Sequence, residues 1–137
     1  MLKTMQLLRW PVAAAVSLIL IDAVSRAAEV PGEPKPKHTI KEVMQGSHVA
    51  KEGEKSLRDI VIGGQATPEQ KQQLLDLYIS LAENKPPRGE LAAFRDKTRL
   101  IVLAAAKVVV GREGAADELG KATNCAACHK DHKPPQQ

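Results

Sequence analysis

The chain has 137 residues, of which 43% are hydrophobic and 26% charged, and its formal net charge is +4. This composition is typical of one small globular domain and excludes a collagen-like, disordered or multi-pass membrane protein. Two cysteines are too few for a disulfide-dense scaffold. The only aromatic residues are Trp10, Tyr78 and Phe94, so we expect something other than aromatic side chains to fill part of the core.

Residues 1–27 have the pattern of a cleavable signal peptide. Two basic residues precede an apolar run over residues 10–21, and small residues at positions 25 and 27 fit cleavage after Ala27. The alternative is a transmembrane anchor, but a membrane span needs about 20 apolar residues, and Asp22 interrupts this shorter run. We therefore expect an exported, periplasmic protein with no membrane span after cleavage.

Cleavage after Ala27 changes the charge and the methionine content of the chain. It removes three basic residues and one acidic residue, which lowers the net charge from +4 to +2. So small an excess of positive charge does not suggest a nucleic-acid partner. It also leaves Met44 as the sole methionine.

Residues 28–38 are rich in proline and predict an extended leader ahead of the first helix. Thr39 followed by Glu42 has the spacing of a capping box. Behind this cap, five residues recur at the spacing of one helix face: Ile40, Val43, Met44, Ser47 and His48. The pattern predicts a first helix with Met44 and His48 on its core face.

Three further segments show helical starts or stops. Residues 56–62 predict a short helix that ends at the Gly63-Gly64 pair. Thr67-Pro68-Glu69-Gln70 combines an N-cap, a proline at the first helical position and a capping box, and Pro86-Pro87 ends the stripe that follows. A longer helix is predicted from Gly89 or Glu90 to Val110. Because residues 100–110 form an apolar run, a buried strand is the alternative there, but the sequence offers no second strand to pair with it.

The last predicted helix starts near Gly114 or Ala115 and carries four residues on one face: Leu119, Ala122, Ala126 and His129. No alternating strand pattern occurs, so we expect an all-α fold. This fold would be a four-helix bundle over residues 39–133 with a C-terminal haem-attachment helix. Residues 134–137 are expected to form a disordered tail.

Residues 125–129 read Cys-Ala-Ala-Cys-His, the pattern of covalent haem attachment. Cys125 and Cys128 lie three positions apart, so on a helix they lie on neighbouring sides of one turn and can meet the two vinyl groups of a porphyrin. The adjacent His129 supplies an imidazole to the iron. The motif uses both cysteines of the chain and therefore predicts one covalently bound haem c.

Three other interpretations compete for this motif. A disulfide or thiol redox pair is one, but thioredoxin-like motifs lie beside a βαβ pattern that this sequence lacks. A zinc site could use Cys125, Cys128, His129 and His132, although zinc spacings normally separate the cysteine pair from the histidine pair. The third is a chance match on a surface helix. With haem, the porphyrin would fill the aromatic-poor core, and alanines 122, 126 and 127 would allow its close approach.

An exported four-helix bundle with a haem-attachment motif near its C-terminus resembles the class II cytochromes c, the cytochrome c′ group. The resemblance covers residues 38–133, and its specific motif is the segment from Cys125 to His129. In the family, the histidine is followed by two residues, an aromatic residue and a basic one. Here His132 stands at the aromatic position and Lys133 at the basic position. The chain is also shorter than typical members, as expected of a small divergent subgroup.

The resemblance implies two possible functions, which differ in the sixth iron ligand. Low-spin members use a methionine of the first helix and carry electrons, whereas high-spin members leave the position open and bind small gases such as nitric oxide. Met44 is the candidate ligand, although methionine is more commonly core filling. His48, one turn later on the same face, is the rival ligand or a neighbour of a propionate. His38 precedes the helix cap and is a poor candidate.

The expected function is therefore single-electron transfer between redox partner proteins, and not enzymatic catalysis. Hydrolase chemistry has no support, because no Ser-His-Asp set, phosphate-binding glycine loop or paired carboxylate occurs in a credible place. Lys121, Lys130 and Lys133 surround the motif, where they would steer an acidic partner, pair with haem propionates or simply be solvated. A homodimer is possible by resemblance to the family.

Overall fold

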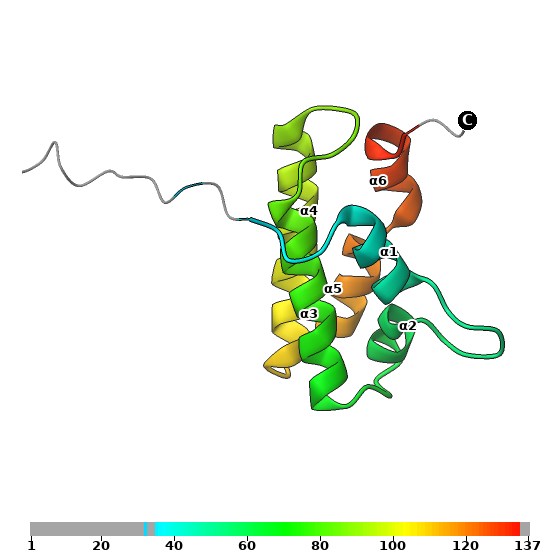
Figure 1. The fold of residues 1–137 in the computed structure, drawn as a ribbon. Coiled ribbons are helices and arrows are strands. Elements are labelled where there is room, and N and C mark those ends of the chain that lie inside the picture. The colour runs from blue at the N-terminus through cyan, green and yellow to red at the C-terminus, as the bar shows by residue number, and fades with distance from the viewer. Residues whose placement is uncertain (1–31, 33–34, 135–137) are drawn as a thin grey trace, which may run out of the picture. The chain divides into compact units, whose positions relative to one another are not determined.

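The computed structural model describes residue 32 and residues 35–134. Residues 35–134 belong to one compact unit, Glu33–Gln137. The predicted signal peptide and most of the predicted tail lie outside the described residues. Within them the secondary structure is helical throughout, which confirms the all-α prediction (Figure 1). Six helices are described: α1 (Ile40–His48), α2 (Leu57–Ile62), α3 (Pro68–Glu83), α4 (Leu91–Val109), α5 (Ala115–Ala122) and α6 (Cys125–His132).

The N-terminal caps form as the sequence predicts. The Thr39 side chain accepts a hydrogen bond from the Glu42 backbone N–H, and the Glu42 carboxylate accepts one from the Thr39 N–H, which completes the capping box of α1. Thr67 and Gln70 form the same box at the start of α3. These caps fix where α1 and α3 begin.

The valine-rich run of residues 100–110 is helical, as predicted, and not a strand. Its buried residues recur at helical spacing along α4 and continue the face of Phe94 and Thr98: Ile101, Ala104, Ala105 and Val108. Leu100 and Leu103 lie on the opposite face and are 62% and 54% exposed. One apolar stripe of α4 is therefore enough to cover the core, because α4 lies at the edge of the bundle.

The prediction of one continuous last helix is wrong, because this segment forms two helices, α5 and α6. α5 ends at Ala122, and the Asn124 side chain accepts hydrogen bonds from the backbone N–H groups of Ala126 and Ala127, which starts α6. Asparagine competes well for free backbone donors and therefore favours a new helix start over a continued helix. As a result Leu119 is fully buried, whereas Ala126 and His129 are exposed and do not continue its face.

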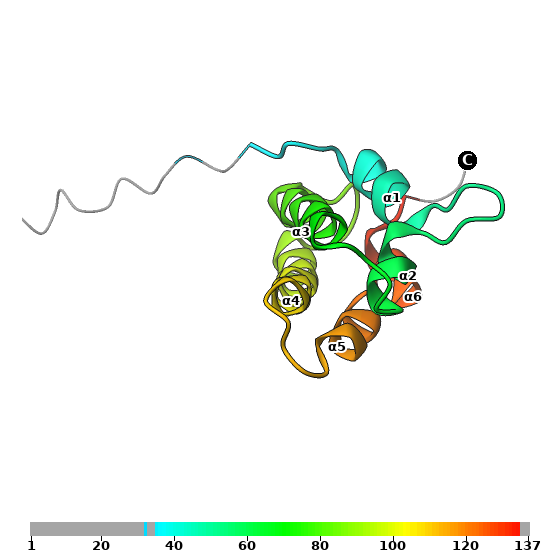
Figure 2. The same ribbon diagram turned by 90° about the horizontal axis from the view of Figure 1, so that it is seen from below.

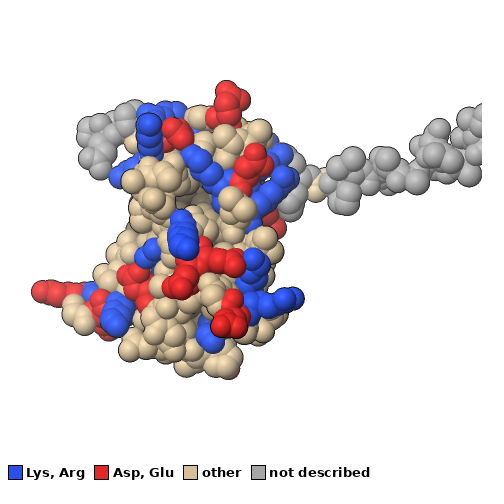
Figure 3. All heavy atoms as spheres, turned by 180° about the vertical axis from the view of Figure 1, so that it is seen from behind, with Lys and Arg blue, Asp and Glu red and all other residues tan. Residues whose placement is uncertain are grey.

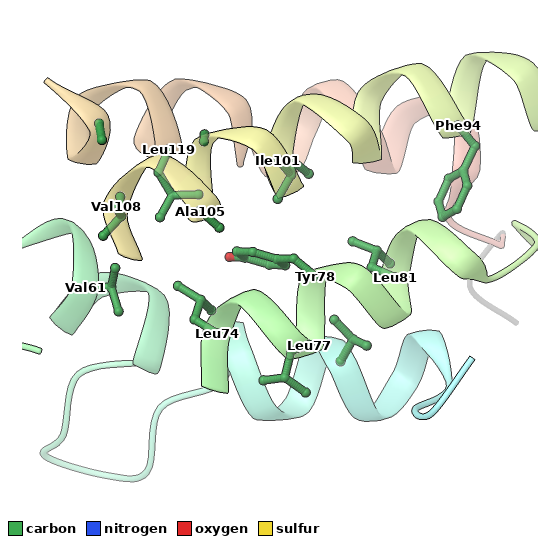
Figure 4. Packing of buried hydrophobic residues seen from close by; sticks show 13 residues of the cluster. Val61, Leu74, Leu77, Tyr78, Leu81, Phe94, Ile101, Ala105, Val108 and Leu119 are labelled. Atoms are coloured by element: carbon green, nitrogen blue, oxygen red, sulfur yellow. The ribbon is translucent and has the colours of Figure 1, made fainter. Parts of the chain in front are cut away.

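The helices pack around a single core. Helix α3 packs against α1, α2 and α4, and α5 packs against α2 and α4. Figure 2 shows this arrangement along the bundle, with α2 between α1 and α5. Tyr78 projects from α3 into the centre of the core, close to Leu74, Leu81 and residues of α4 (Figure 4). The core thus depends on one aromatic ring at its centre and on aliphatic side chains around it.

The end of the predicted leader is anchored on α3. Lys37 forms an ion pair with Asp76 at 2.7 Å, and the Asn84 side chain donates a hydrogen bond to the His38 carbonyl oxygen at 2.8 Å. These contacts lead the chain into α1 at a defined place, which in turn places Met44 and His48.

Candidate cofactor pocket

A pocket of about 730 Å³ lies between α1 and α6, and we call it the α1–α6 pocket. In the described part of the chain, the backbone of α1 packs on α2 and α3, whereas the backbone of α6 packs on α4. The volume lies within the range of about 300–1,000 Å³ that is common for small-molecule and cofactor sites. Its lining includes six residues singled out in the sequence: Met44, His48, Cys125, Cys128, His129 and Lys133.

Helix α1 presents two different stripes to its surroundings. Val43 and Ser47 are completely buried, and the Ser47 hydroxyl donates to the Val43 carbonyl oxygen at 2.6 Å. Ile40, Met44 and His48, spaced four residues apart, line the pocket instead. Ile40 and Met44 are partly buried and also pack against the core, so Met44 lies where the core meets the pocket.

Helix α6 brings the two thiols and His129 to the same pocket. Cys125 follows the Asn124 cap directly and is exposed, whereas Cys128 is partly buried, and both thiols are free. Burial raises the pKa of Cys128 above its usual value, an effect that exceeds the opposing influence of Lys97. The alanines between them, Ala126 and Ala127, are exposed and do not line the pocket. Of the three alanines expected to lie beside a porphyrin, only Ala122 lines it.

Polar contacts hold α6 in place. The Arg88 guanidinium donates to the backbone carbonyl oxygens of Lys130 and Asp131 near the end of α6. The Lys97 ammonium donates to the Ala127 carbonyl oxygen at 2.8 Å and forms an ion pair with Asp131 at 2.7 Å. The hydrogen bond from Lys97 and its charge together lower the pKa of the Asp131 carboxyl. Helix α6 is thus fixed mainly by hydrogen bonds to its backbone.

His132 is the buried residue of α6. Its side chain is 4% exposed, its ring lies edge-on to Phe94 with centroids 5.3 Å apart, and its Nδ1 atom is 3.1 Å from the Arg88 carbonyl oxygen. Its Nε2 atom is buried without a hydrogen-bond partner among the described residues. His132 therefore packs against Phe94 and lines the pocket as a buried ring rather than as an exposed side chain.

His48, on the α1 side, is linked to the core through Tyr78. The Tyr78 hydroxyl oxygen lies 3.4 Å from His48 Nε2, and the two ring centroids are 5.9 Å apart. Burial lowers the pKa of His48, and the cationic Arg58 acts in the same direction. Burial raises the pKa of Tyr78. Both groups are therefore neutral at physiological pH.

Lysines provide the formal charge on the pocket lining. Lys41, Lys85 and Lys133 line it, and no aspartate or glutamate is among the lining residues. An apolar pocket bordered by ammonium groups suits a flat apolar ligand that carries carboxylates. Lys121 and Lys130 are exposed and do not line the pocket. On the face of the molecule shown in Figure 3, basic and acidic residues are interspersed.

Comparisons with protein-family models, with curated proteins and with solved structures found no match to the chain. Among the described residues, no group of three or more His, Cys, Asp or Glu side chains is arranged to hold a metal ion. None of the described helices combines the length and apolar character needed to cross a membrane.

Sequence reasoning missed four residues that shape this pocket: Arg88, Lys97, Asn124 and His132 in its role as a buried contact. Asn124 could have been found, because Asn is a strong N-cap and directly precedes the motif. His132 carries one signal in the sequence, because a histidine stands there at the position that is aromatic in the resembled family. Arg88 and Lys97 give no local signal, since their partners, backbone carbonyl groups and the Asp131 carboxylate, lie far along the chain.

Proposed function

We propose that this protein is an exported c-type cytochrome with one covalently bound haem, which carries single electrons between redox partner proteins. The observation that carries the proposal is that one pocket is lined by Cys125, Cys128 and His129 of the attachment motif on α6 and by Met44 on α1. The class II cytochromes c are the family that this combination resembles. The proposed location is the periplasm, where residues 1–27 would direct the chain.

The residues of the pocket fit a haem. Two free thiols at the required spacing are available for thioether bonds, and the lining is mostly apolar. Lys41 and Lys133 provide ammonium groups for the two propionates. Tyr78 and Phe94 are the aromatic residues of the core in the described part of the chain, and a porphyrin would add further apolar surface.

Each residue has a defined role in the proposal. Cys125 and Cys128 would hold the cofactor, and His129 and Met44 would bind its iron. When bound, the haem supplies one-electron exchange between ferrous and ferric iron. A methionine and a histidine ligand favour a higher reduction potential than two histidines do. The buried walls formed by Phe94 and Ile101 lower the local polarity, which further tunes the potential.

The direct test is the intact mass of the protein after expression in a host that matures c-type cytochromes. We expect the mass of the cleaved chain plus one haem, and an optical spectrum of a low-spin haem in both oxidation states. The variant Cys125→Ala/Cys128→Ala should lack covalent haem and serves as the control. Colourless wild-type protein would contradict the proposal. Rapid binding of carbon monoxide to the reduced protein, without displacement of a ligand, would favour gas binding at an open sixth site instead.

A further inference from the structure

The α1–α6 pocket holds a rival for Met44, because His48 lies one turn later on α1 and lines the same space. Imidazole is a strong ligand for haem iron, so a free His48 would compete with the thioether of Met44. The structure contains a feature that bears on this competition, namely the contact between His48 Nε2 and the Tyr78 hydroxyl at 3.4 Å.

Tyr78 is held firmly in the core. Its side chain is completely buried, and it extends from α3 among Leu74, Leu81 and the facing residues of α4 (Figure 4). A buried hydroxyl without a hydrogen-bond partner costs about 1–3 kcal/mol. The hydroxyl therefore favours the conformation of His48 that keeps Nε2 within reach.

The tautomer of His48 decides which of its nitrogen atoms has a lone pair that could bind a metal. A neutral imidazole has one N–H group and one lone pair. Because the buried hydroxyl is satisfied when it donates, we assign the lone pair to Nε2 as the acceptor and the ring proton to Nδ1. In this tautomer neither nitrogen is free to bind a metal.

The groups around His48 do not oppose this assignment. On α2, Arg58 and Asp59 act on His48 in opposite directions, since Arg58 lowers its pKa and Asp59 raises it. The two also form an ion pair with each other at 2.7 Å, which balances their charges. On α6, His129 adds to the lowering of the His48 pKa. The effect of Asp59 on the His48 pKa is thus smaller than the effect of burial, and the His48 ring stays neutral.

We infer that Tyr78 is a positioning residue that withholds His48 from the iron and so leaves the sixth position to Met44. The inference rests on the proposed function, because it names what selects the ligand in that same pocket. The inference is independent of the attachment motif, because the motif predicts His129 as one iron ligand and does not predict the other ligand.

The test uses haem-loaded protein and the replacement Tyr78→Phe, which keeps the buried ring and removes only the hydroxyl. With Tyr78 intact, Met44→Ala should convert the low-spin haem to high-spin, because His48 stays engaged. In Met44→Ala/Tyr78→Phe the freed His48 should restore a low-spin spectrum with two nitrogen ligands. Adding His48→Gln to this pair should return the haem to high-spin. Thermal unfolding and helix content, followed by circular dichroism, establish that each variant is folded.

A second measurement does not depend on replacing a ligand. In the reduced wild-type protein, nitrogen-15 NMR of labelled histidine should show the His48 proton on Nδ1. Tyr78→Phe alone should weaken the sulfur-to-iron absorption band and lower the reduction potential, as histidine replaces methionine in part of the molecules.

The outcomes separate the two proposals. Protein without covalent haem overturns both. A haem protein whose Met44→Ala variant is already low-spin through His48 overturns the role of Tyr78 and leaves the cytochrome proposal standing. A high-spin Met44→Ala/Tyr78→Phe variant, or a proton found on His48 Nε2, overturns the role of Tyr78 in the same way.

Discussion

The Nδ1 atom of His132 lies 3.1 Å from the backbone carbonyl oxygen of Arg88, so the end of α6 is hydrogen-bonded to the loop that joins α3 to α4. Gly89 follows in that loop with φ +80°, a conformation that side chains disfavour. A Cβ atom at Gly89 would lie 2.7 Å from the Asp131 carbonyl oxygen and 2.8 Å from His132 Nδ1. The loop and α6 can approach this closely only because residue 89 has no side chain.

Replacement of Gly89 by alanine should therefore disturb α6 specifically. Gly111 is a matched control, since its φ is +71° but a Cβ atom there would meet nothing within 4 Å. We expect Gly111→Ala to cost about 1–2 kcal/mol from backbone strain alone. Gly89→Ala should cost about 1–3 kcal/mol more, because atoms must move apart. Urea unfolding measures the difference, and equal losses in the two variants would contradict the close packing described here.

The Asn124 cap should determine that α6 begins at Cys125, the first residue of the Cys-Ala-Ala-Cys-His motif. Removal of its side chain in Asn124→Ala deletes the acceptor for two backbone N–H groups and should cost about 1 kcal/mol. Asn124→Ser retains a capping oxygen and should lose much less. Hydrogen exchange at Ala126 and Ala127 should become faster in Asn124→Ala alone. The control Thr67→Ala, which removes the cap of α3, should leave exchange at these two amides unchanged.

The fold was largely predictable from local signals, because each of α1 to α4 carries its own cap, stop or apolar period. The break between α5 and α6 was not predicted, since the apolar spacing from Leu119 to His129 is consistent with one helix. Only the Asn124 side chain, which competes for backbone donors, ends that pattern. Four of the residues that line the pocket were singled out from the sequence, namely Met44, Cys125, Cys128 and His129. Its polar supports were not, because contacts of Arg88 and Tyr78 join residues far apart in sequence.

His48 should make stability depend on pH. Burial lowers its pKa below the ordinary value of 6.5, so the unfolded chain binds a proton more readily than the folded protein does. Stability should therefore be unaffected by His48 above pH 6.5 and should decrease as the pH falls below that value. His48→Gln should reduce this decrease between about pH 7 and pH 5. The midpoint of urea unfolding at several pH values is the measurement, and identical pH profiles for the two proteins would contradict the burial of His48.

Leu119 should be among the most sensitive positions of the core. It is completely buried, so Leu119→Ala should lower the free energy of unfolding by about 2–5 kcal/mol. Leu100, which is 62% exposed on α4, is the control, and Leu100→Ala should change stability by no more than about 0.5 kcal/mol. Chemical denaturation distinguishes the two. A small effect at Leu119 would mean that α5 contributes little to the core.

The way α6 is held has a consequence for how the protein would be assembled. His132 is the only residue of α6 described as buried, and the helix packs on α4 alone among the described helices. In the proposed cytochrome, Cys125 and the partly buried Cys128 would both have to be accessible for their thioether bonds to form. Displacement of α6 would cost the hydrogen bonds to Arg88 and Lys97 and the burial of His132, whereas the interior around Tyr78 would keep its contacts. In the proposed cytochrome, helices α1 to α5 would thus form their side of the pocket independently of the haem, and α6 would complete the pocket.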